Sequence, residues 1–167
     1  MQPKTLHKNT LDDKHLIISF FMSNQTQSSN MFVETGPITS GEIFPDEQSF
    51  LHNKNEQTTA PFARVKLLID TGANISGIDS SIINGVGLPS YNDYSEVNGV
   101  GGIHALKRYR CVLFLKIFGL KGLPIDILEG DFSESPYDGV IGRDVLQFCT
   151  FSYHGPSNSF QLMADNF

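Results

Sequence analysis

One short segment of this chain places a carboxylate directly after an apolar run. Two apolar residues lead into Asp70, and Thr71, Gly72 and Ala73 follow it. This pattern predicts an acid held at the end of a buried strand, in the rigid and partly dry setting that suits acid–base chemistry. A surface aspartate would not need apolar residues before it. Asp70 is therefore the candidate catalytic residue.

Two later segments add weight to this motif. Residues 99–102 read Gly-Val-Gly-Gly, which predicts a hairpin tip, because glycines in a strand serve conformational freedom or close backbone approach. Residues 140–146 place two apolar residues and a glycine before a predicted helix. A nucleotide-binding loop would need a third glycine at a set spacing and a helix behind it, and residues 99–102 lack both. A plain hairpin turn without functional movement stays an alternative.

The order of these three segments resembles the retropepsin-like aspartic proteases, and most of all their small single-domain bacterial members. The resemblance covers roughly residues 61–167 and includes the Gly-Arg-Asp-Val-Leu run at 142–146. It implies a mainly β, closed barrel-like acid-protease domain with a flap hairpin and one short C-terminal helix. The activity it implies is that of an aspartic endopeptidase, which hydrolyses peptide bonds without a cofactor.

The same resemblance assigns roles around the candidate acid. Because the chain holds one Asp-Thr-Gly, two copies of Asp70 would form the catalytic dyad across a homodimer. One carboxylate would take a proton from water while the other protonates the peptide carbonyl. Thr71 would bond to the partner's loop, Gly72 would let substrate approach and adopt a positive φ at little cost, and Ala73 would keep a pocket wall small.

Substrate contacts are expected from Asn74 and from the flap. Many retroviral members carry Asp at the position of Asn74, and an amide cannot form an ion pair with Arg143. We therefore expect Arg143 to bond backbone carbonyls near Asn74, or to pair with Asp144 or Asp138. The predicted flap residues, of which Val100 and Ile103 would make the apolar contacts, are Gly99, Val100, Gly101, Gly102 and Ile103. The predicted structural supports are Ile141, Gly142, Arg143 and Asp144.

The composition of the chain limits the number of domains and the kinds of partner that we expect. With 167 residues and 40% hydrophobic content, the chain suits one core. We expect a protease-like domain over 31–167 and a mobile, polar tail over 1–30. The net charge of −6 argues against nucleic acid. The apolar run at 16–22 is too short to cross a bilayer and has an acidic flank, so we expect no membrane partner and a cytoplasmic location.

Metal and disulfide chemistry receive little support. The five histidines are dispersed without ligand spacing, so no metal is expected. Cys111 and Cys149 lie in apolar runs that predict buried thiols, and a disulfide between them stays open.

Hydrophobic periodicity gives the expected elements. Alternating apolar and polar residues predict a strand over 62–69 that enters the Asp70 turn. Asp79 or Ser80 is expected to cap a short helix over 81–84. The polar segment 45–59 is predicted to be a loop, and the apolar run at 16–22 is compatible with a strand. Further strands are expected at 31–38, 75–78, 91–97, 103–118, 123–128, 149–153 and 160–163, and a helix at 143–148.

Two other functions stay open. A dimeric peptide-binding or scaffolding domain would keep the same fold with little turnover, because a fold alone does not establish activity. The domain would also be able to cleave its own amino-terminal tail.

Overall fold

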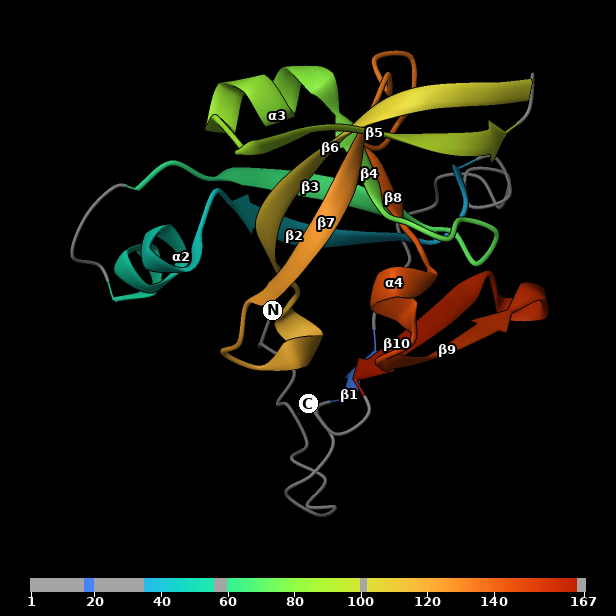
Figure 1. Cartoon of the computed structure of the whole chain (residues 1–167). Helices are drawn as coiled ribbons and strands as arrows, with labels where there is room; N and C mark the ends of the chain where they lie inside the picture. The colour runs from blue at the N-terminus through green and yellow to red at the C-terminus, as the bar shows by residue number, and fades with distance from the viewer. Residues whose placement is uncertain (1–16, 20–34, 56–59, 100–101, 165–167) are drawn as a thin grey trace.

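The computed structural model describes residues 17–19, 35–55, 60–99 and 102–164 of the chain. These residues form a mainly β fold, as the sequence predicts (Figure 1). The elements, in chain order, are β1 (Ile17–Ser19), β2 (Ile38–Phe44), α2 (Glu47–Lys54), β3 (Ala63–Ile69), β4 (Gly77–Asp79), α3 (Ser80–Val86), β5 (Ser90–Gly99), β6 (Gly102–Phe114), the 3-10 turn η1 (Lys116–Phe118), β7 (Leu123–Gly130), β8 (Gly139–Ile141), α4 (Arg143–Leu146), β9 (Cys149–His154), the 3-10 turn η2 (Gly155–Ser157) and β10 (Ser159–Ala164). No helix in these ranges has the length and apolar character needed to cross a membrane.

The larger sheet closes on itself. It has seven strands in the order β2-β3-β8-β4-β7-β6-β5, and β2 also pairs with β6. Every strand of this sheet except β5 therefore belongs to a barrel-like ring. The short strand β8 lies between β3 and β4, parallel to the first and antiparallel to the second. A ring of this kind leaves few open strand edges, and β5 carries one of them.

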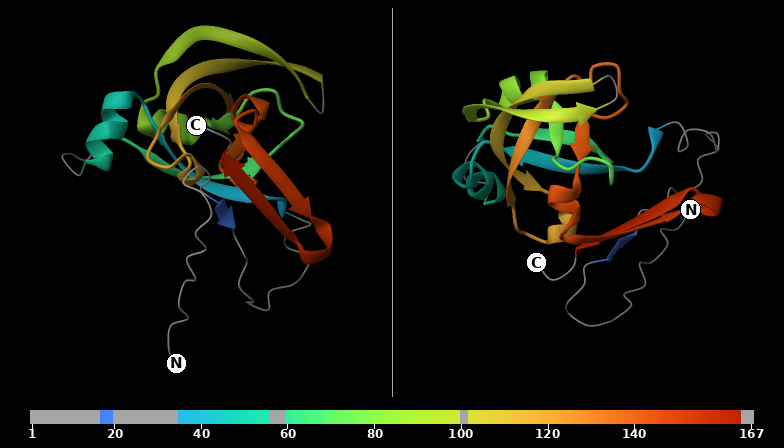
Figure 2. Two further views of the ribbon diagram at one scale, coloured as in Figure 1. Left: turned by 90° about the horizontal axis from the view of Figure 1, so that it is seen from below. Right: turned by 45° about the vertical axis from the view of Figure 1, so that its right-hand side comes forward.

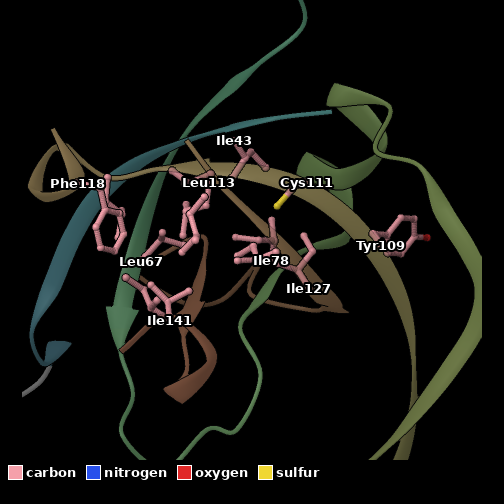
Figure 3. Close-up of a cluster of buried hydrophobic side chains, with 14 of the residues drawn as sticks. Ile43, Leu67, Ile78, Tyr109, Cys111, Leu113, Phe118, Ile127 and Ile141 are labelled. Atoms are coloured by element: carbon pink, nitrogen blue, oxygen red, sulfur yellow. The ribbon is translucent and has the colours of Figure 1, made fainter. Parts of the chain in front are cut away.

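The interior of the ring is filled by aliphatic side chains at alternating strand positions. In β3, Val65, Leu67 and Ile69 are buried, whereas Arg64 and Lys66 face outward. This period of two is the pattern that the sequence shows, because successive strand side chains point to opposite faces. Figure 3 shows how residues from several strands meet in this core, among them Ile43, Leu67, Ile78, Leu113, Ile127 and Ile141.

A second, three-stranded sheet has the order β1-β10-β9. The β9–β10 hairpin extends from the barrel as a red arm in Figure 2. Leu162 of β10 is buried in the main core, which fixes the base of this arm. Ile17 pairs with Met163, so residues 17–19 of the predicted tail form a strand. The rest of the tail, 1–16 and 20–30, lies outside the described residues.

Two predictions for the first third of the chain are wrong. The segment 45–59 was predicted as a loop, yet α2 begins there with Asp46 as its cap, since Asp46 Oδ1 accepts a hydrogen bond from Ser49 N at 2.7 Å. Phe50 anchors this polar helix, with its ring centroid 5.3 Å from that of Phe44. A strand is predicted over 31–38, but among its described residues 35–37 are not in a strand, and β2 begins only at Ile38, after Gly36 with its φ of 74°. Residues 31–34 lie outside the described residues.

Candidate active site

Asp70 stands where β3 ends, beside the short strand β8. Ile69 pairs with Ile141 in the parallel ladder, and Asp70 N donates a hydrogen bond to Ile141 O at 3.0 Å. The half-buried side chain turns back on its own loop, where Oδ1 accepts a hydrogen bond from Gly72 N at 2.8 Å. In the described part of the chain, the second carboxylate oxygen has no protein partner. The loop therefore holds one oxygen of this carboxylate.

The loop that carries Asp70, residues 70–76, is fastened to the start of α4. We call this segment the Asp70 loop. Arg143 N donates to Ala73 O at 2.9 Å, and Asp144 N donates to Asn74 O at 3.2 Å. The first N–H groups of a helix have no partner within the helix, and here the loop carbonyls accept them. Gly142 allows this close approach, because a Cβ there would lie 2.8 Å from the carbonyl carbon of Ile75.

Arg143 also holds the Asp70 loop through its side chain. Its Nη1 donates to Thr71 O at 2.8 Å, and its Nη2 donates to the side-chain oxygen Oδ1 of Asn74. Arg143 therefore bonds to groups of the loop near Asn74, which is one of the arrangements that the sequence predicts, and does not pair with Asp144 or Asp138 among the described contacts. Asp138 instead accepts a hydrogen bond from Lys66 N at 2.7 Å. A planar guanidinium suits this role, because it presents several donors in a fixed geometry.

Ser76 and Asp144 form a second set of hydrogen bonds between the Asp70 loop and α4, which the sequence analysis does not predict. Asp144 accepts hydrogen bonds from Ser76 N at 3.0 Å and from Ser76 Oγ at 2.8 Å. Ser76 Oγ in turn accepts a hydrogen bond from Gly142 N at 3.0 Å. Ser76 is 3% exposed, so these groups replace water that cannot reach them. The only sequence signal was a serine inside an apolar return strand, and its partner is far along the chain.

The role given to Gly72 is corrected in one respect. Gly72 was expected to use a positive φ, but it is not among the described glycines with a positive φ, which are Gly36, Gly87, Gly102 and Gly119. Its lack of a side chain matters for space instead. A Cβ at Gly72 would lie 3.0 Å from Asp70 Oδ1, in the place where the backbone N–H reaches that oxygen.

The glycine-rich hairpin is formed by β5 and β6, and its last described pair is Gly99 with Gly102. In Figure 1 the hairpin and the loop that follows β3 project to the same side of the barrel, and both views of Figure 2 agree. Ile103 is 72% exposed near the hairpin end. Val100 and Gly101, which were also predicted to contact substrate, lie outside the described residues.

Two other ionisable groups near the core, Asp79 and Cys111, are part of the packed fold. Asp79 caps α3, and hydrogen bonds from Ser81 Oγ, Phe132 N and Ser81 N hold the pKa of its carboxyl below the ordinary value. Burial raises the pKa of the Cys111 thiol to about 12. Cys111 and Cys149 are not joined by a disulfide, which closes that alternative. Among the described residues, no three His, Cys, Asp or Glu side chains gather as a metal site requires.

Comparison with known proteins identifies similar folds among solved structures. No family model matches the chain, and no curated protein matches it. The EIAV protease in complex with an inhibitor is 21% identical, with a TM-score of 0.46 over 69% of this chain and 88% of that chain. A retropepsin-like aspartic protease from Rickettsia conorii is 15% identical, with a TM-score of 0.44 over 77% of this chain and 94% of that chain.

Proposed function

We propose that this protein is an aspartic endopeptidase whose active site is completed by a second copy of the same chain. Each copy supplies one Asp70, and the two carboxylates share a proton, because like charges so close together do not both ionise. One carboxylate takes a proton from the attacking water while the other protonates the scissile carbonyl. No cofactor takes part, and the activity optimum is mildly acidic, where one proton is shared.

The observation that carries this proposal is the position of Asp70, at the end of β3 in a loop that α4 holds in place. Its Oδ1 accepts a hydrogen bond from Gly72 N, and its second oxygen has no protein partner in the described residues. The neighbouring acid Asp144 uses both oxygens for Ser76, whereas Asp138 uses one oxygen for the backbone of β3. Because the chain holds one Asp-Thr-Gly, the proposal takes the dyad partner of Asp70 from another chain.

The remaining residues of the Asp70 loop receive roles around this pair. Thr71 is exposed and bonds to the partner copy's loop, which keeps the two carboxylates coplanar. Ala73 and Asn74 lie along the substrate backbone, and Arg143 keeps the loop in position. Gly99, Gly102 and Ile103 of the hairpin cover the bound peptide.

The test is the substitution Asp70→Asn, which keeps the size of the side chain and removes its charge. The expected result is a loss of casein or peptide-library cleavage by at least about 10³-fold, because the proton-transferring group is gone. The matched control is Asp131→Asn, an equal change in an exposed loop, which is expected to leave cleavage unchanged. Equal cleavage by wild type and Asp70→Asn would refute the proposal.

Sedimentation at several concentrations tests the second copy. The expected behaviour is a dimer, with activity per chain falling as dilution separates the copies. A strict monomer that still cleaves peptides would contradict the shared dyad. A dimer that binds peptides but cleaves none of them would favour the binding or scaffolding alternative.

A further inference from the structure

The β5–β6 hairpin divides into a supported half and an outer half. From Arg108 onward, β6 also pairs with β7, and near its end it pairs with β2. From Gly102 to Lys107, its only strand partner in the described structure is β5. Residues 102–105 are exposed. Because an isolated two-stranded hairpin is marginally stable in water, the outer half depends on how its base is held.

The backbone ladder is interrupted at this base. Ser90 pairs with Tyr109 and Tyr94 pairs with Lys107, so three residues of β5 face the single residue Arg108. Asn92, in the middle of this bulge, has a φ of 55°. Asp93 Oδ1 accepts a hydrogen bond from Tyr94 N at 2.8 Å, so a side chain satisfies backbone that the ladder leaves out.

Side chains from three strands replace the missing ladder. We call them the base cluster: Tyr91, Asp93, Arg108, Arg110 and Asp126. Asp126 lies at its centre, where its Oδ2 accepts a hydrogen bond from Arg108 Nη2 at 2.8 Å and its Oδ1 accepts one from Tyr91 OH at 2.9 Å. Arg110 Nε lies 3.4 Å from Asp126 Oδ1, and Arg108 Nη1 donates to Asp93 Oδ2 at 3.3 Å.

The ring of Tyr91 adds contacts of another kind. The guanidinium carbons of Arg108 and Arg110 lie 5.5 Å and 6.0 Å from its centroid. Such cation–π contacts tie the bulged strand to β6 in addition to the hydrogen bonds. Asp126 stands on β7, which belongs to the barrel. The base cluster therefore connects the bulge of β5 to the rigid body of the protein.

The cluster also adjoins the Asp70 loop. Arg108, Arg110 and Asp126 line a cavity of about 410 Å³ whose other walls include Ile75 of the Asp70 loop and Asp144 of α4. A change in the direction of the hairpin at its base would therefore occur beside the segment that holds the candidate acid.

We propose that the bulge is a hinge for the outer half of the hairpin, residues 94–99 and 102–107, and that Asp126 is the positioning residue that fixes its direction relative to the Asp70 loop. This inference rests on the proposed function for its catalytic consequence, because the outer half carries the residues that cover the peptide. Asp126 acts through Arg108 and Tyr91 and does not touch the substrate.

Hydrogen exchange measured by mass spectrometry tests the hinge without any need for activity. The full chain carries Asp70→Asn throughout, so that self-cleavage does not interfere, and Asp126→Asn is added. Two partly exposed ion pairs and a hydrogen bond are weakened together, so amides of the outer half are expected to exchange about fivefold faster, with no change in β3. Tyr91→Phe, which removes one hydrogen bond, is expected to give about a twofold increase.

The matched control is Glu96→Gln, an equal acid-to-amide change on the exposed side of β5 outside the base cluster. Exchange in the outer half that is equally fast in Asp126→Asn and Glu96→Gln would overturn the hinge. Faster exchange in both the outer half and β3 would also overturn it, because the barrel itself would have loosened.

A kinetic comparison separates this proposal from the proposed function. In chains that keep Asp70, Asp126→Asn is expected to lower kcat/KM about fivefold, while Asp131→Asn, an equal change outside the hairpin, leaves it unchanged. If no Asp70-dependent cleavage is found, the proposed function fails, and faster exchange in Asp126→Asn alone still supports the hinge. If cleavage depends on Asp70 but kcat/KM is equal in the two variants, the positioning role of Asp126 is refuted.

Discussion

The Asp70 loop and the β5–β6 hairpin show two ways in which this chain presents residues on one side of its barrel. The loop is short and is joined to α4 by backbone N–H groups, by the Arg143 guanidinium and by the buried Ser76 hydroxyl. The outer hairpin has one ladder and exposed side chains, and its base is held by partly exposed charges.

The difference follows from what each region has to do under the proposed function. A group that transfers protons gains from a fixed position, since a displacement of about 1 Å can cost about 10²-fold in rate. A segment that admits and covers a peptide has to move, and low local stability permits this. We therefore expect substitutions at the Asp70 loop to have larger effects than those at the base cluster.

After Asp70→Asn, the largest effect is expected for Arg143→Lys. An ammonium group keeps the charge but cannot reach both Thr71 O and the side chain of Asn74 in one fixed arrangement. The loop would shift, and kcat/KM is expected to fall about 10²-fold in a peptide-cleavage assay. Arg64→Lys, on the outer face of β3, is the matched control and is expected to have no effect. An active Arg143→Lys variant would show that the Arg143 guanidinium is not needed to hold the loop.

Ser76→Ala tests the buried hydrogen bonds that the Ser76 hydroxyl makes with Asp144 and Gly142. The change leaves Gly142 N and one oxygen of Asp144 without the Ser76 hydroxyl, in a place that is closed to water. The free energy of unfolding is expected to fall by about 2 kcal/mol, as measured by urea denaturation. Ser152→Ala, on the exposed side of β9, serves as the control. A loss no larger than that of the control would mean that water replaces the hydroxyl.

Asp79→Asn tests the charged residue that caps α3, through the pH dependence of the free energy of unfolding. The pKa of Asp79 is lower in the folded chain than its ordinary value of 3.8, so its charge stabilises the fold above that value. This contribution is lost as the pH falls through the lowered folded pKa. At about pH 7 the variant is expected to be about 1 kcal/mol less stable than wild type, and the two should converge in strong acid. A difference that does not vary between neutral pH and strong acid would rule out the charge as its cause.

The last prediction concerns the rates at which the two cysteine thiols are modified, and it involves no change in stability. Cys111 is fully buried, and its pKa of about 12 keeps it protonated near neutral pH, whereas Cys149 is half-buried. At about pH 8, maleimide is expected to modify Cys149 first and Cys111 only when the barrel unfolds. Mass spectrometry of Cys149→Ser checks this, because native chains of that variant should stay unmodified. Rapid modification of Cys111 would show that the barrel opens as readily as the hairpin.

Local sequence patterns were enough to predict the strand that leads to Asp70, the cap of α3 and the two arms of the hairpin, although the second arm ends at Phe114 and not at 118, because residues 116–118 form a 3-10 turn. Each of these depends on neighbours within a few residues, such as the alternation of β3 or the Asp79 side chain that accepts a hydrogen bond from Ser81 N. Helix α2 was missed because its polar sequence has little apolar periodicity. Its one buried residue, Phe50, packs with Phe44 of the preceding strand and with Val112 and Phe114 of β6, which is far along the chain.

The sequence by itself determined the chemistry that is available: one acid behind an apolar strand, small residues after it, and a glycine-rich turn. Only the tertiary structure decided that Asp144 uses both oxygens to hold the Asp70 loop, while Asp70 has one oxygen without a protein partner among the described residues. Ser76 and Asp144, like Asp126 and Tyr91, are far apart in the sequence and meet only because the strands beside them lie close together in the large sheet. A hydrogen bond between such residues forms only if the distance between its two atoms is right to within a few tenths of an ångström. The spacing of residues along the chain does not give this distance.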